Sequence, residues 1–215
     1  MKTLRLPEAT HRLAAAALLC LGATLPAGAT TLLRMDTADL THAADRVVHA
    51  RATDQRVFWD AAGTTIYTET TFQVIDEAKG SGPSTITVRL LGGRIDPVEM
   101  SAPGTPSFSL GEEVVLFATP GLSGAHNLAG YSQGVMRVKV DAATGHRTAV
   151  SQVAAGVSVM QRTASGLRQV QPATGHVDLS ALLSEIRQIA AGAAGPGQMK
   201  PRQLQQRQAP EGGNN

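Results

Sequence analysis

The segment most suggestive of chemistry is Gly130-Tyr131-Ser132-Gln133-Gly134, which matches the pattern G-x-S-x-G. In esterases this pattern forms a nucleophile elbow, in which a strand ends at a strained turn and a helix begins directly after the serine. Here a predicted loop precedes Ser132 and a period-two strand follows it, so the context favours a glycine-flanked turn. A serine hydrolase that uses Ser132 remains the alternative function. Its acid and base would come from one of two pairs, Asp141 with His146 or Asp178 with His176.

The histidines are spread too widely along the chain to predict a metal site. His42 and His49 flank a predicted helix–strand junction, and three more stand alone in predicted loops, at His126, His146 and His176. The pattern H-E-x-x-H, which groups metal ligands on one helix face, is missing. Adjacent Glu112 and Glu113 would point to opposite faces of a strand, which does not make a carboxylate pair. We therefore expect no metal, no cofactor and no catalytic residue outside the Ser132 alternative.

Aromatic residues make up only 3% of the chain, so a group of them is informative. Phe58 and Trp59 lie beside a turn, and Tyr67 follows near the start of the next strand. Exposed aromatic residues on the rim of a barrel can bind peptide or sugar. The other interpretation is that Phe58 and Trp59 close one end of the core. We take Phe58, Trp59 and Tyr67 as the candidate binding residues.

Residues 1–29 are expected to be a Sec-type signal peptide. A positive start, an apolar stretch over 13–25 and the small residues Ala27-Gly28-Ala29 follow one another, which predicts cleavage after Ala29. Two alternatives stay open. One is a signal anchor that is not cleaved. The other is lipidation of Cys20, although leucines rather than a small residue precede it.

The basic character of the chain belongs to that leader. Of 19 basic and 17 acidic residues, three basic residues and one acidic residue lie in 1–29, so the net charge of the remainder is zero. A neutral chain offers no electrostatic case for binding nucleic acid or an anionic membrane. Cleavage also removes Cys20, which excludes disulfides and thiolate metal sites. These features predict a bacterial periplasmic or secreted protein with no integral membrane segment after cleavage.

Strand patterns dominate 30–192, which we predict to be a single β-rich domain. The clearest strand, 65–76, alternates between two faces, with Phe72 on one and Tyr67 on the other. Further strands are expected at 47–52, 84–91, 113–118, 134–141 and 147–153. Helices are expected at 37–44 and between Asp178 and Gly192, and long loops at 94–112 and 120–130. The segment 155–175 fits no single pattern, and 193–215 has the composition of a disordered Gln/Pro/Gly tail.

This pattern predicts a mainly β fold, a small antiparallel OB-like barrel or sandwich of about 5–6 strands with a short N-terminal helix and a C-terminal helix. Several short motifs follow one another over 40–140, at 44–50 (ADRVVHA), 66–68 (IYT) after Trp59, 72–74 (FQV) before Lys79-Gly80, 87–89 (TVR) before Gly92-Gly93, 108–117 (FSLGEEVVLF) and 133–138 (QGVMRV). The string resembles a family of uncharacterised exported bacterial proteins. Its layout is similar to the OB-like barrel of netrin-like domains and tissue inhibitors of metalloproteinases.

The resemblance implies a fold but no functional residue. Tissue inhibitors bind the protease zinc through an N-terminal cysteine, whereas the expected N-terminal residue here is Thr30. The sequence thus predicts an exported, non-enzymatic binding or interaction module. Its partner would be an exported protein or peptide, with an exported protease as one candidate.

Overall fold

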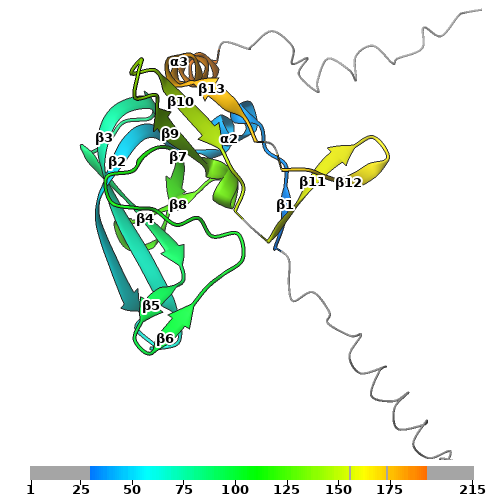
Figure 1. Cartoon of the computed structure of the whole chain (residues 1–215). Helices are drawn as coiled ribbons and strands as arrows, with labels where there is room; N and C mark the ends of the chain where they lie inside the picture. The colour runs from blue at the N-terminus through cyan, green and yellow to red at the C-terminus, as the bar shows by residue number, and fades with distance from the viewer. Residues whose placement is uncertain (1–29, 155, 173, 193–215) are drawn as a thin grey trace, which may run out of the picture.

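The computed structural model describes residues 30–154, 156–172 and 174–192 (Figure 1). The predicted signal peptide at 1–29 and the predicted tail at 193–215 lie outside these residues. The described part is mainly β, as predicted, with one helix near each end. Within these ranges no helix is long and apolar enough to cross a membrane.

Five strands close a ring, the barrel, in the spatial order β7–β2–β3–β4–β8. Their bounds are β2 Arg46–Trp59, β3 Ile66–Lys79, β4 Thr85–Leu91, β7 Glu113–Pro120 and β8 His126–Leu128. The neighbours are antiparallel except β4 and β8, which are parallel, and β8 returns to pair with β7. This closed five-stranded arrangement is that of an OB-type barrel.

The barrel interior follows from strict alternation along β2 and β7. The inward-facing residues of β2 are Val48, Ala50 and Ala52. Inside the barrel they belong to one apolar cluster with residues of the neighbouring strand β7. Phe72 and Phe108 fill the centre with their rings edge to face, 5.0 Å between centroids. The rest of this interior cluster is apolar, with Ile86, Val88, Leu90, Val114, Leu116, Ala118, Leu128 and Val135.

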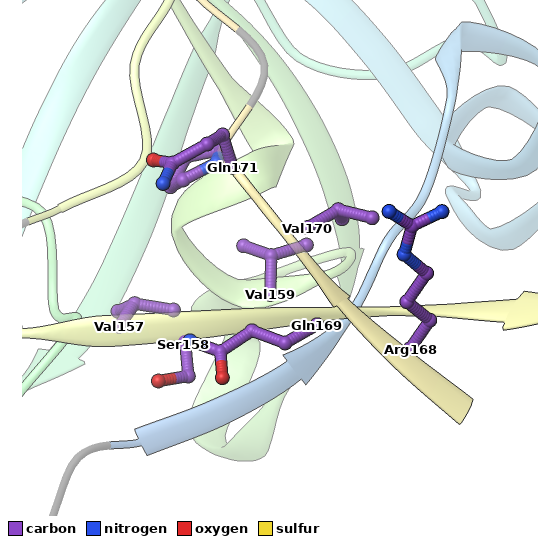
Figure 2. Close-up of a pocket in the computed structure, with 8 residues that line it drawn as sticks. Val157, Ser158, Val159, Arg168, Gln169, Val170 and Gln171 are labelled. Carbon is purple, nitrogen blue, oxygen red and sulfur yellow. The ribbon is translucent and has the colours of Figure 1, made fainter.

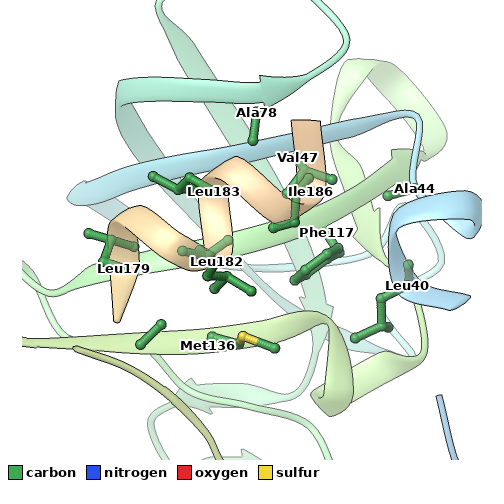
Figure 3. Packing of buried hydrophobic residues seen from close by; sticks show 13 residues of the cluster. Leu40, Ala44, Val47, Ala78, Phe117, Met136, Leu179, Leu182, Leu183 and Ile186 are labelled. Atoms are coloured by element: carbon green, nitrogen blue, oxygen red, sulfur yellow. The ribbon is translucent and has the colours of Figure 1, made fainter. Parts of the chain in front are cut away.

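A second core lies outside the barrel, beneath the two helices α2 (Thr37–Ala43) and α3 (Leu179–Ala190) (Figure 3). The outward residues of the same strands, such as Val47 and Phe117, pack against Leu182 and Ile186 of α3. Asp178 caps α3 by accepting a hydrogen bond from the Ala181 amide at 2.8 Å. The first residues of β2 and most of β7 are thus covered on both faces, which explains the continuous apolar run 114–118 in β7.

Three further strands extend the sheet from β7, in the order β9 (Val135–Val140), β10 (Arg147–Ser151) and β13 (His176–Asp178). Another three form a separate sheet, which we call the arm: β1 (Thr30–Leu33), β11 (Val157–Thr163) and β12 (Gly166–Val170). Strand β1 runs parallel to β11, and the tip of the β11–β12 hairpin projects away from the barrel in Figure 1. The segment 155–175, whose pattern was ambiguous, largely forms this hairpin.

Three expected segments differ in the structure. The strand expected at 47–52 continues to Trp59. After an irregularity at Thr53, the polar residues 54–56 pair with β3 although they carry no apolar alternation. The expected loop at 94–112 begins with a hairpin of β5 (Gly93–Ile95) and β6 (Val98–Met100). The expected loop at 120–130 contains the short helical turn η1 (Leu122–Gly124) and β8.

Glycine explains the sharp entry into the β5–β6 hairpin. Gly92 has φ +105°, and a Cβ there would lie 2.8 Å from the Met100 carbonyl oxygen. Only glycine permits that close approach of two backbones. The Gly92-Gly93 pair therefore starts a new hairpin rather than a loop.

Candidate functional site

Two of the three candidate aromatic residues meet on the outer face of the barrel. Phe58 of β2 lies opposite Tyr67 of β3, with their rings stacked at 6.2 Å between centroids and 30° between planes. Trp59 is the next residue along β2, so its side chain points to the other face of the sheet, where it is 36% exposed. Phe58 and Tyr67 thus form one surface, and Trp59 does not belong to it.

Two arginines contact the Phe58 ring. The guanidinium carbon of Arg56 lies 4.9 Å from the ring centroid, and that of Arg89 on β4 lies 5.4 Å from it. These distances are in the range of cation–π contacts. The pairing register explains the arrangement, because Arg56, Glu69 and Arg89 lie directly opposite one another on β2, β3 and β4.

Glu69 is the common anchor of both arginines. Arg56 donates from Nε to Oε2 at 2.7 Å, and Arg89 donates from Nε to Oε1 at 2.7 Å. The Nη2 atoms form ion pairs with the same two oxygens, at 2.6 Å for Arg56 and 2.5 Å for Arg89. The glutamate is only 5% exposed. Burial by itself would raise the pKa of Glu69, but the hydrogen bonds and charges of Arg56 and Arg89 outweigh it and lower the pKa below its ordinary value. The carboxylate therefore stays charged and fixes both guanidinium groups.

We call Arg56, Phe58, Tyr67, Glu69 and Arg89 the aromatic–arginine face. The sequence indicated only its aromatic part. Alternation along 65–76 places Tyr67 and Glu69 on one face, which was a usable signal. Arg56 was missed because residues 53–59 were not expected to belong to the strand, and Arg89 was missed because its partner strand and register were unknown.

The G-x-S-x-G motif forms η2 (Tyr131–Gly134), a single 3-10 turn after Gly130 at φ +63°. Ser132 is 1% exposed, and its Oγ has no hydrogen-bond partner among the residues that the structure describes. A nucleophilic serine needs a base within hydrogen-bond reach. A Cβ on Gly134 would lie 2.2 Å from the Ala129 carbonyl oxygen, so this glycine is required for a tight backbone contact. The geometry is that of a packed turn.

Gln133 gives that turn a structural use. Its Oε1 accepts from the Met35 amide at 3.0 Å, and its Nε2 donates to the Leu33 carbonyl at 2.9 Å. The segment between β1 and α2 is thereby tied to the turn. The motif joins parts of the chain about a hundred residues apart.

Three of the four acid and base candidates for Ser132 form contacts of their own, and the fourth, His176, is exposed on β13. His146 lies 3.6 Å from Asp178, and Asp178 caps α3. Asp141 accepts hydrogen bonds from the amides of Ala143 and Thr144 in the β9–β10 turn, which lower its pKa. None of the hydrogen bonds among the described residues joins these groups to Ser132.

A second buried carboxylate lies on the outer surface of β7. Glu113 accepts from His49 Nε2 at 3.0 Å and from Arg51, and Arg147 lies 3.6 Å away. Burial would raise the pKa of Glu113, but the hydrogen bonds from Arg51 and His49 and the charge of Arg147 lower it overall. Within the described ranges no group of three or more His, Cys, Asp or Glu side chains could hold a metal ion.

The arm carries a groove of about 610 Å³ along β11 and β12 (Figure 2). In Figure 2, Val159 and Val170 lie between Val157 and Arg168. Among the described residues that line it, Arg168 is the one titratable side chain, so this lining offers no acid–base pair. A smaller cavity of about 260 Å³ lies between the arm and the helices, with Leu40, Gln133, Met136, Val159 and Leu182 in its lining.

No family model, curated protein or solved structure matches this chain. The resemblance to an exported bacterial family and to netrin-like barrels therefore stays a prediction.

Proposed function

We propose that this protein is an exported, non-enzymatic binding module, and that it recognises a segment of a partner protein through the aromatic–arginine face. The observation that carries the proposal is the contact of two guanidinium groups with the Phe58 ring on the outside of the barrel, at 4.9 Å and 5.4 Å from its centroid. Arginine and aromatic residues are the types that dominate binding energy at protein interfaces.

Charge defines the chemistry of the partner. Two guanidinium groups share the single carboxylate of Glu69, which leaves one net positive charge over the three residues. Arg56 is 67% exposed, and its Nη1 has no hydrogen-bond partner among the described residues. A carboxylate of the partner would satisfy these free donors in a charge-assisted hydrogen bond.

Preorganisation supports the same conclusion. Arginine side chains ordinarily lose rotamer freedom when they bind a ligand, which weakens affinity. Here the buried carboxylate of Glu69 holds Arg56 and Arg89 before any partner arrives, and the stacked Tyr67 limits the Phe58 ring. The face is therefore ordered without a ligand, as a binding site on rigid strands should be.

The test is selection of peptides on the purified protein from a library of random heptapeptides, followed by affinity measurements on the Phe58→Ala variant. Selected peptides should bind the unchanged protein and lose about tenfold or more in affinity on Phe58→Ala, the effect of removing an aromatic anchor. Leu122→Ala is the matched control, because Leu122 is an apolar residue that is 80% exposed on η1. Peptides that bind all three proteins equally, or a library without any selected peptide, would refute the proposal.

The serine-hydrolase alternative makes a separate prediction. A fluorophosphonate probe would label the protein covalently, and Ser132→Ala would abolish the labelling. We expect no labelling, because the Ser132 hydroxyl is buried without a base beside it.

A further inference from the structure

Part of β2 has a free edge directly beside the aromatic–arginine face. Strand β2 pairs with β3 up to Trp59, but it pairs with β7 only from Arg46 to Arg51. Beyond Ala52, which bonds to the Glu112 backbone, the second edge of β2 has no strand partner among the residues that the structure describes. An open edge of this kind can accept another strand.

One hydrogen bond shows which backbone groups point to that edge. The carbonyl of Ile66 accepts from the Gly92 amide at 2.8 Å, so it points toward β4 and away from β2. Trp59 lies opposite Ile66, and its own amide and carbonyl therefore point away from β3. Because directions alternate along a strand, Val57 and Gln55 also present their backbone groups to the free edge.

We propose that an extended segment of the partner protein, with one acidic residue placed opposite Arg56, adds to this edge as an antiparallel strand. This rests on the proposed function and specifies how its site is used. Each added residue would continue a ladder that already crosses three strands. Charge alternates along the row Arg89–Glu69–Arg56, so the residue of the added strand that lies opposite Arg56 should carry a carboxylate. The row Leu91–Tyr67–Phe58 is apolar, so the residue of the added strand that lies opposite Phe58 should be apolar or aromatic.

The spacing of the two ladders gives a sequence for the bound segment. Arg56 and Phe58 are two residues apart on one face, so their partners must also be two residues apart. In the antiparallel direction the apolar residue comes first and the acidic residue third. The segment thus reads apolar–any–acidic from its N-terminus.

A second copy of this chain would place like charges opposite each other in two of its symmetric registers. A symmetric antiparallel pair centred on Val57 would place Asp54 opposite Asp60 of the other copy. A pair centred on Arg56 would place two arginines opposite each other. Like charges directly opposite destabilise a sheet. Pairs centred on Gln55 or Phe58 would instead place Arg56 opposite Asp54 or Asp60, so self-pairing is tested below as the outcome that would overturn the choice of occupant.

The experiment uses two synthetic peptides, Lys-Thr-Phe-Thr-Glu-Thr-Lys and its reversal, Lys-Thr-Glu-Thr-Phe-Thr-Lys, with binding measured by fluorescence anisotropy. The first should bind about tenfold more tightly than the second. Val57→Pro removes an outward amide donor at a position where an edge strand tolerates proline. It should weaken the first peptide about tenfold, whereas Val57→Ala, which keeps the amide, should not.

A second measurement covers the case in which Val57→Pro does not fold. N-methylation of the peptide threonine that follows Phe removes the matching donor from the ligand and should cause the same loss. If Phe58→Ala abolishes binding while Val57→Pro and N-methylation have no effect, strand addition is refuted and the proposed function stands. If Phe58→Ala also has no effect, both are refuted. A dimer in sedimentation velocity that Val57→Pro dissociates would overturn the choice of occupant.

Discussion

Two buried carboxylates on the barrel surface, Glu69 and Glu113, have similar surroundings and different consequences. Each is less than a tenth exposed, each binds arginines, and each has a lowered pKa. Glu113 also accepts from His49, which is 3% exposed, so that cluster satisfies a buried polar side chain. Glu69 instead holds two arginines against the partly exposed Phe58 ring.

The same ion-pair chemistry thus serves two purposes, according to the side chains that lie beside the carboxylate. A carboxylate that satisfies a buried histidine chiefly prevents a loss of stability. A carboxylate that positions exposed cations beside an aromatic ring creates a surface for a ligand. The two clusters can therefore be separated by experiments that measure stability and binding independently.

Removing each carboxylate should give the largest contrast. Glu113→Ala leaves His49 without its hydrogen-bond acceptor and should lower the free energy of unfolding by about 3 kcal/mol. Glu69→Ala should cost about 1 kcal/mol, because Arg56 is 67% exposed and water can solvate it. Urea denaturation measures both values. A larger loss for Glu69→Ala would contradict the assignment of roles.

Binding should show the opposite order. Glu69→Gln keeps the shape of the side chain but removes the charge that fixes Arg56 and Arg89, so affinity for a selected peptide should fall about tenfold. Glu113→Gln is the matched control and should leave peptide affinity unchanged. Titration calorimetry measures both, and equal losses would mean that the two clusters are not independent.

Acid should destabilise the protein through both carboxylates. Each has a folded-state pKa below the ordinary value of 4.5. Their contribution to stability is therefore complete above pH 4.5 and is lost as the pH falls through the lower folded-state pKa. In either glutamine variant the free energy of unfolding should decrease less steeply below pH 4.5. Denaturation curves at a series of pH values test this, and an unchanged slope in both variants would exclude these groups as the cause.

The smallest effect is expected at the rim of the Glu113 cluster. Arg147 is 45% exposed and lies 3.6 Å from the carboxylate. Arg147→Ala should lower the free energy of unfolding by about 0.5 kcal/mol, and less at high salt. Thermal unfolding at two salt concentrations measures it. A loss as large as that of Glu113→Ala would show that Arg147 is a main partner.

The sequence was most informative where alternation and capping are local. The strand expected at 65–76 and the helix after Asp178 are both present, because each depends on residues a few positions apart. The β-rich barrel was likewise predictable from the number and spacing of such segments. The extension of β2 over 53–59 was not, because its polar residues pair through backbone groups that every sequence possesses.

The candidate site was only partly predictable for a related reason. The scarcity of aromatic residues pointed to Phe58 and Tyr67. Their partners Arg56 and Arg89 come into contact through the register of three strands, and register between distant strands is set by the whole sheet. The same alternation of side chains along a strand places Tyr67 on this face and Trp59 on the other.

The ring of strands has one weak seam. β3 and β4 pair continuously from Tyr67 to Gln73, whereas β4 and β8 meet at a single register position, Val88 with His126. Backbone amides along this seam are expected to exchange with deuterated solvent sooner than those between β2 and β3. Local opening of the barrel is thus expected along the β4–β8 contact, while the β2–β3–β4 sheet remains paired.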